Sequence, residues 1–109
     1  MHYDLRDSEE EDGQRMLNVL MSGSKSDIHR HTDTSEVLVC IYGSAIKRFC
    51  DEQSNETEVV VMKAGSDTPG VWTEQGRYHS LEATDELEVI FESMAYRYEQ
   101  GKTEDILKV

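Results

Sequence analysis

The sequence is poor in proline, cysteine and basic side chains, and each shortage excludes a class of protein. Its 109 residues include one proline and two cysteines. Because no proline- or serine-rich tract resembles a linker, we expect one domain over residues 1–109. Cys40 and Cys50 lack the paired spacing of a zinc motif and are typical of a reduced, cytoplasmic protein.

Basic residues are outnumbered by acidic residues, 11 to 23, which gives a formal net charge of −12. A surface this acidic repels nucleic-acid phosphates and anionic membranes, so we expect neither as a partner. No apolar run approaches the roughly 18 residues of a membrane-spanning helix. Residues 1–6 also lack the basic and apolar regions of a secretory signal, which again favours a cytoplasmic location.

Short apolar segments, separated by clusters of turn residues, are the main pattern that is present. They are 16–21, 36–42, 45–50, 57–62, 71–73, 78–83 and 87–91. This spacing predicts an all-β fold, a single small antiparallel β-barrel of seven or eight strands. An N-terminal segment, 1–14, and a C-terminal tail, 99–109, should flank the barrel. A helical turn or two is expected only within 99–107.

Two histidines and a glutamate stand just before the most apolar run of the chain. On a strand, residues two apart share a face, so His29 and His31 should have Cβ atoms roughly 6–7 Å apart. The turn residues 32–35 can reverse the chain and return Glu36 to the same interior face. There Glu36 would lie on the side of Leu38, where an unpaired carboxylate costs several kcal/mol. A divalent cation shared with the imidazoles removes this cost.

His79 is the fourth candidate ligand, since Gly76 can supply a tight turn before the strand that carries it. Simpler interpretations exist for every histidine. A His-x-His pair can be a surface coincidence, and a lone strand histidine is more often a core or rim residue. We give that second interpretation to His2, near the terminus.

The histidine region resembles the first motif of the cupin superfamily. That motif reads Gly, five residues, His-x-His, three or four residues, Glu, six residues, Gly. Every spacing is met by Gly23, His29, His31, Glu36 and Gly43.

The second cupin motif, Pro-x-Gly-x-x-His, is matched only in part. Gly76 and His79 match it, whereas Glu74 stands where proline is usual. The flanking glycine and asparagine of the motif fall on Thr68 and Ala83. The turn before His79 therefore departs from the family pattern.

More narrowly, the chain looks like the WbuC-type cupin-fold metalloproteins. The similarity runs from about Tyr3 to Tyr98 and includes "YDLRDSEEEDGQRMLNVL", "IHRHTDTSE", "GRYHSLEA" and "VIFESMAY". The family usually ends in Gly-Pro-Tyr after the Phe-Glu pair, where this chain has Met94-Ala95-Tyr96. That family is associated with bacterial surface-polysaccharide synthesis.

The resemblance implies a double-stranded β-helix (jelly roll) and one divalent metal ion per chain, held by His29, His31, Glu36 and His79. This ligand set leaves coordination positions open and suits Fe, Mn, Ni or Zn. The resemblance favours a metal-dependent isomerase or epimerase acting on a small carbohydrate in bacterial polysaccharide metabolism. The alternatives are a non-catalytic, metal-dependent module that binds a sugar or another small molecule, and a purely structural metal.

Four further side chains are candidates for binding a substrate. Trp72 and Tyr78 can stack on a sugar, and Arg48 or Arg77 can bind a carboxylate or phosphate. Each also has a commoner interpretation: Trp72 as core, Tyr78 as facing away from His79, and the two arginines as solvated. We also expect a homodimer, formed edge to edge as in other small cupins.

Overall fold

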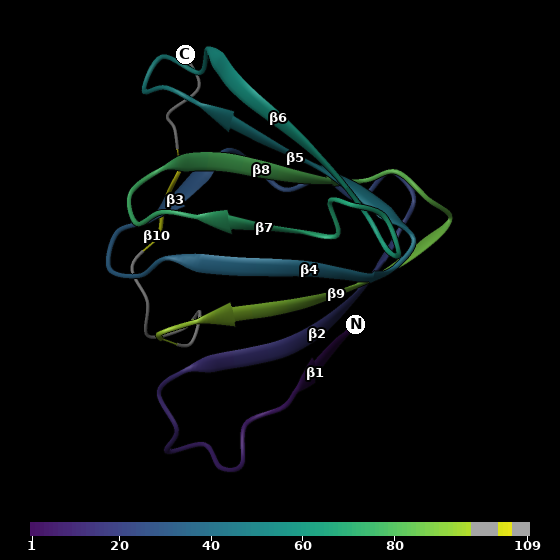
Figure 1. The fold of residues 1–109 in the computed structure, drawn as a ribbon. Coiled ribbons are helices and arrows are strands. Elements are labelled where there is room, and N and C mark those ends of the chain that lie inside the picture. Colours follow the sequence, from purple (N-terminus) through teal and green to yellow (C-terminus); the bar gives the residue numbers. More distant parts are fainter. Residues whose placement is uncertain (97–102, 106–109) are drawn as a thin grey trace.

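The protein is a sandwich of two antiparallel β-sheets (Figure 1). The computed structural model describes residues 1–96 and the backbone of residues 103–105. Its ten strands are β1 (His2–Asp4), β2 (Gln14–Met21), β3 (His29–His31), β4 (Glu36–Tyr42), β5 (Ser44–Cys50), β6 (Glu56–Lys63), β7 (Gly70–Thr73), β8 (Tyr78–Ala83), β9 (Leu87–Met94) and β10 (Thr103–Asp105). Among the described residues, no helix could cross a membrane.

The two sheets have five strands each. Sheet A has the order β1-β2-β9-β4-β7, and sheet B has the order β10-β3-β8-β5-β6. The expectation of an all-β, antiparallel jelly roll is confirmed, but the closed barrel is not observed. No hydrogen-bonded ladder joins the two sheets within the described part of the chain, and connections such as 32–35 carry the backbone from one sheet to the other.

The interior between the sheets has an apolar half and a polar half. Along β4, the inward side chains change from Glu36 to Leu38 and Cys40, and all three are buried. Along β8 they change likewise, from His79 to Ala83. The apolar half holds the core cluster of Leu38, Cys40, Ala45, Met62 and Ile90. The polar half contains the buried side chains of Glu36 and His79.

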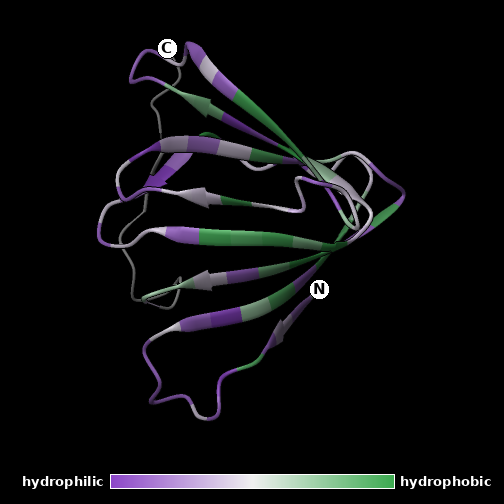
Figure 2. Cartoon of the chain, in the orientation of Figure 1, coloured by the Kyte–Doolittle hydropathy of each residue, from purple (hydrophilic) through white to green (hydrophobic). Residues whose placement is uncertain are grey.

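Strand β4 is hydrophobic along most of its length, whereas the connection between β1 and β2 is hydrophilic (Figure 2). The apolar run 37–42 is therefore not all core. Val37 and Ile41 point outward and are exposed, while Leu38 and Cys40 point inward. Alternation along one strand puts apolar side chains on both faces of sheet A.

Both ends of the chain contain strands that the sequence did not predict. Within the segment 1–14, β1 pairs with β2 at the edge of sheet A. In the tail, residues 103–105 form β10, which pairs with β3. The helical turn expected within 99–107 is thus wrong for 103–105, and the rest of that range lies outside the described residues. These three-residue strands exist because a neighbour offers an unpaired edge.

Candidate metal centre

Three histidines from neighbouring strands of sheet B meet inside the sandwich. The backbone register places His29 on β3 directly opposite His79 on β8, and their ring centroids are 4.4 Å apart. His31 completes the group, with its ring 5.2 Å from His29 and 5.5 Å from His79. One ligand atom from each residue lies within 4.8 Å of the other two. The same face predicted for His29 and His31 is therefore observed.

Backbone contacts orient two of the three imidazoles. His29 Nδ1 lies 2.8 Å from the carbonyl oxygen of Asp27, and His79 Nδ1 lies 2.9 Å from that of Arg77. A carbonyl oxygen only accepts, so each Nδ1 carries the proton and each Nε2 keeps its lone pair. His79 Nε2 is buried and has no hydrogen-bond partner among the residues that the structure describes. This is the orientation found in histidines that bind metals.

Two of the imidazoles, those of His29 and His79, are held in their neutral form. Burial, together with the positive charge of Lys47, lowers the pKa of His79 to about 3. Burial likewise lowers the pKa of His29. Neutral imidazole is the form that coordinates a cation, because protonation occupies the lone pair.

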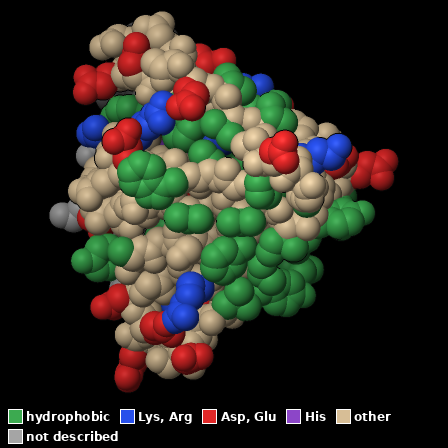
Figure 3. Space-filling model, in the orientation of Figure 1, with side chains coloured by type: hydrophobic (Ala, Val, Ile, Leu, Met, Phe, Trp, Pro, Cys, Tyr) green, Lys and Arg blue, Asp and Glu red, His purple; other side chains and the backbone are tan. Residues whose placement is uncertain are grey.

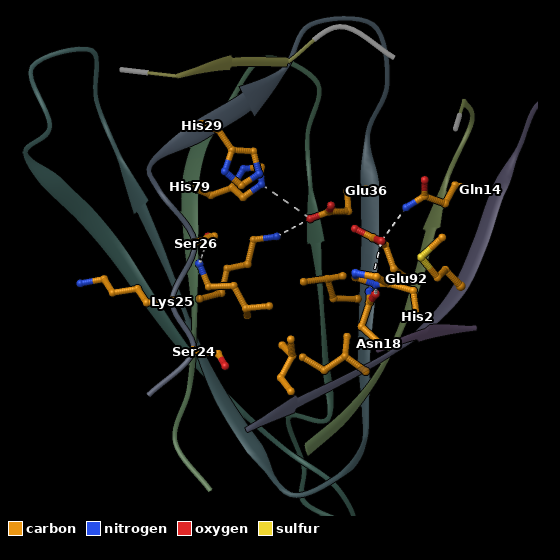
Figure 4. A pocket seen from close by; sticks show the side chains of 16 residues that line it. His2, Gln14, Asn18, Ser24, Lys25, Ser26, His29, Glu36, His79 and Glu92 are labelled. Carbon is orange, nitrogen blue, oxygen red and sulfur yellow. Dashed lines mark hydrogen bonds and ion pairs between the residues drawn. The ribbon is translucent and has the colours of Figure 1, made fainter. Parts of the chain in front are cut away.

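Glu36 reaches the histidines from the opposite sheet, where it opens β4 (Figure 4). Its Oε2 lies 3.3 Å from His31 Nε2, and its Oε1 lies 3.7 Å from His79 Nε2. If the turn 32–35 simply reversed the chain, β4 would lie next to β3. Glu36 does face the interior, but β4 pairs with β9 and β7 instead. The turn crosses between sheets, so the carboxylate faces the imidazoles across the sandwich.

Lys47, which sequence reasoning missed, is the cation next to Glu36. This lysine is fully buried on β5, and its Nζ lies 2.5 Å from Glu36 Oε1. Burial alone would raise the pKa of Glu36, but the hydrogen bond with His31 and the charge of Lys47 hold it well below its usual range. Alternation places Lys47 on the same face as Ala45 and Phe49, which is the signal that could have identified it.

A cavity of about 620 Å³ opens beside these groups. His29, His79, Glu36 and Lys47 lie on one side, and Figure 4 shows a second polar group on the other. There, Glu92 accepts hydrogen bonds from the amides of Gln14 and Asn18, and His2 bonds to Asn18. His2, interpreted from the sequence as a core or rim residue near the terminus, lines this cavity from β1.

Glu92 is a titratable carboxyl group inside the cavity. Burial raises its pKa to about 7, and the nearby charge of Glu36 acts in the same direction. The group therefore exists in both protonation states near neutral pH. Sequence reasoning missed Glu92 because its position in β9 gives no signal apart from alternation with Ile90 and Met94.

The four candidate substrate residues are not among those that line this cavity. Arg48 forms an ion pair with Glu82, at 2.5 Å. Arg77 lies over the Phe49 ring, 3.8 Å from its centroid, and pairs with Glu58 at 2.9 Å.

Trp72 and Tyr78 also lie away from the cavity wall. Trp72 is 61% exposed on the outer face of sheet A, so it is not a core residue either. Tyr78 lies beneath the guanidinium of Arg30, 4.7 Å from its ring centroid, and alternates with the inward His79.

The model of a family described as "Domain of unknown function (DUF6016)" matches residues 1–62, more than half of the sequence. The chain belongs to the DUF6016 family. The matched part of this DUF6016 chain includes His29, His31 and Glu36, whereas His79 lies beyond it. No curated protein sequence matches the chain.

Solved structures share the fold of this DUF6016 protein. The capsular polysaccharide assembling protein CapF from Staphylococcus aureus superposes with a TM-score of 0.69 and 20% identity over 90% of this chain, which spans 29% of CapF. TT1209 from Thermus thermophilus superposes with a TM-score of 0.70 and 15% identity, and the match covers 89% of this chain and 83% of TT1209. A Klebsiella pneumoniae protein with a double-stranded β-helix domain superposes with a TM-score of 0.68 and 16% identity, and the match covers 90% of this chain and 73% of that protein. The fold is therefore a double-stranded β-helix.

Proposed function

We propose that this chain is a divalent-metal-binding cupin in which His29, His31 and His79 hold one ion at the cavity. The observation that carries the proposal is the convergence of three imidazoles, two of them buried and one half-buried, with their ligand atoms within 4.8 Å of one another. Fe, Mn, Ni and Zn all fit such a nitrogen-rich set.

The three ligand atoms are near enough to close around an ion. Metal–nitrogen distances of about 2.1 Å put neighbouring ligand atoms about 3.0 Å apart in octahedral geometry and about 3.4 Å apart in tetrahedral geometry. Because the ligand atoms of the trio lie within 4.8 Å of one another, side-chain rotations that move these atoms by up to about 1.5 Å would bring them to these separations. A bound ion would supply Lewis-acid chemistry toward a hydroxyl or carbonyl oxygen.

Glu36 is proposed as the fourth ligand, through one of its two oxygens. Lys47 holds Oε1 at 2.5 Å, whereas Oε2 faces His31 Nε2 at 3.3 Å. The carboxylate can thus contribute Oε2 to the ion while Oε1 remains hydrogen-bonded to the ammonium. The buried ammonium also offsets part of the negative charge, which limits how strongly the site binds a dication.

A small hydroxylated molecule, such as a sugar, is the ligand class that we propose for the cavity. Hydroxyl groups both donate and accept, and the wall formed by Gln14, Asn18 and Glu92 offers both functions. Apolar side chains such as Leu81 and Ile90 line the same cavity and suit a sugar's C–H surface. The resemblance to WbuC-type cupins and the shared fold with a capsular polysaccharide assembling protein support a role in cytoplasmic polysaccharide metabolism.

A second candidate function, an isomerase or epimerase, is favoured by Glu92. A carboxyl group with a pKa of about 7 is suited to carry a proton at neutral pH. An enzyme of this class exchanges a substrate C–H proton with solvent. Incubating a sugar panel in D₂O should give deuterated sugar with the metal-loaded protein and none with Glu92→Gln. Binding of a sugar without deuterium uptake would favour the non-catalytic module.

Metal analysis tests the proposed function directly. After loading and desalting, elemental analysis should find about one ion per chain in the wild type, in line with one ligand set, and close to none in His79→Ala. His2→Ala is a matched control, because His2 lines the same cavity but lies outside the trio. Equal metal contents in wild type, His79→Ala and His2→Ala would overturn the proposal.

A further inference from the structure

The outer face of sheet A is continuously hydrophobic. Strand register aligns Tyr3 with Leu17, Leu17 with Phe91, and Phe91 with Val39, so one apolar row crosses four strands. Viewed from this side, Figure 3 shows hydrophobic side chains across the middle of the face and gathered toward the end where the N-terminus lies. We refer to the outward side chains of β1, β2, β9, β4 and β7 as the apolar face.

Several side chains of the apolar face are well exposed to solvent. Ile41 on β4 is 54% exposed, Trp72 on β7 is 61% exposed, and Met21 on β2 is 68% exposed. Single exposed apolar residues are ordinary, but a continuous patch over a whole sheet marks an interaction surface.

The apolar face is also almost free of charge, in a chain of which 31% is charged. Among the outward positions of its five described strands, Arg15 is the one charged residue, and it pairs with Glu11 at the margin. The outer side of sheet B differs, because Arg48 and Glu82 form an ion pair there. Two copies with a net charge of −12 repel each other over most of their surface, so an uncharged face is where they can meet.

The size of the apolar face is close to that of a small specific interface. Its five strands have 3, 8, 8, 7 and 4 residues, which at about 3.3 Å per residue and about 4.8 Å between strands give a face of about 480 Å². Two such faces in contact bury about 950 Å² in total, close to the roughly 1,000 Å² expected of a specific interface. An uncharged apolar face can pack against the same face of a second copy, as a two-fold contact requires.

We propose that the apolar face is the interface of a two-fold symmetric dimer of this chain. The sheets A of two copies pack face to face and cover Ile41 and Trp72. The cavities of both copies remain accessible, because each cavity lies on the inner side of its sheet A. This arrangement differs from the edge-to-edge pairing expected from the sequence, and it does not depend on the proposed metal function.

Sedimentation equilibrium of the full chain tests the proposal. The wild type should have twice the 12.5 kDa mass of one chain. Ile41→Glu and Trp72→Glu should each raise the dimer dissociation constant at least about hundredfold, because each places two unpaired carboxylates in the interface. Both side chains point to solvent in the single chain, so circular dichroism should show folded variants.

Val61→Glu is the matched control. Val61 is 57% exposed on β6, at the edge of sheet B, and should leave the dimer unchanged. A monomeric wild type would overturn the proposal and leave the face to a different protein or domain. A dimer that Val61→Glu dissociates, but Ile41→Glu and Trp72→Glu do not, would overturn it in favour of edge pairing through β6.

Discussion

At the scale of single residues, Lys47 and Glu36 show how a buried charge depends on its partner. Each is buried, and their charged groups are 2.5 Å apart. Removing one partner leaves the other charge unpaired in the interior. We therefore expect Lys47→Met to lower the free energy of unfolding by about 3–5 kcal/mol, measured by urea denaturation in the presence of a chelator.

The double variant Lys47→Met/Glu36→Gln separates the loss of packing from the loss of charge pairing. Because no unpaired charge remains, it should recover most of the stability lost in Lys47→Met. A single Lys47→Met variant within about 1 kcal/mol of the wild type would show that the carboxylate finds another partner.

Glu88 is a buried carboxyl group in the apolar half of the molecule. Neither of its oxygens has a hydrogen-bond partner among the described residues. Burial raises its pKa from 4.5 to about 7, with a contribution from the charge of Asp85. Between these two values the folded state holds a proton that the unfolded state releases, so this group makes stability fall as pH rises from 4.5 to 7.

Glu88→Gln should remove this pH dependence, because glutamine does not titrate. The Tm of the variant relative to wild type should rise as pH increases from 4.5 to 8, and stay level above that. Thermal melts at a series of pH values provide the measurement. The neighbouring exposed Glu86→Gln is the control and should show no such trend, whereas the same trend in both variants would contradict the assignment to Glu88.

At the scale of elements, the sequence located the longer strands well. The ranges 36–42 and 78–83 coincide with β4 and β8, and 87–91 falls within β9. Alternation and turn residues are local signals, so they identify such strands without the fold. Strands β1 and β10 were missed because three residues at a sheet edge are ordered by the neighbouring strand, which the local sequence does not reveal.

Only the part of the candidate site that lies close together in the sequence could be predicted, because local spacing is readable without the fold. His29, His31 and Glu36 lie within eight residues, and their spacing indicated that they face one interior. Lys47 and Glu92 join them from β5 and β9, which belong to different sheets. Their meeting depends on how the sheets stack, and periodicity within one strand does not contain that information.

Gly43, the residue that connects β4 to β5, occupies a position that only glycine fits without strain. Its φ is 80°, and an added Cβ would lie 2.5 Å from the carbonyl oxygen of Leu87. Gly43→Ala should therefore lose more than about 2 kcal/mol of stability, since strain and a backbone clash act together. Gly65→Ala is the matched control, with a φ of 75° and open space, and should lose only about 1 kcal/mol in urea denaturation. Equal losses would show that the clash is relieved.

At the scale of the whole molecule, the residues of the hydrophobic core and the residues of the candidate site lie in different halves of the interior. The apolar half contains the core cluster, and the polar half holds the histidines, Lys47 and Glu92 around the cavity. The ammonium of Lys47 already offsets the negative charge of the buried Glu36 carboxylate without an ion. We therefore expect the protein to fold without metal, in contrast to a purely structural metal site.

Metal should nevertheless stabilise the folded state, because three converging imidazoles exist only there. An ion at 100 times its dissociation constant adds about 2.7 kcal/mol, which corresponds to roughly 10 °C in Tm for a domain of this size. Calorimetry should show this rise in the wild type and in His2→Ala, and none in His31→Ala. The wild type in chelator should still give one cooperative transition. Loss of that transition would mean that the ion is required for folding, and a rise in His31→Ala equal to that of the wild type would place the ion elsewhere.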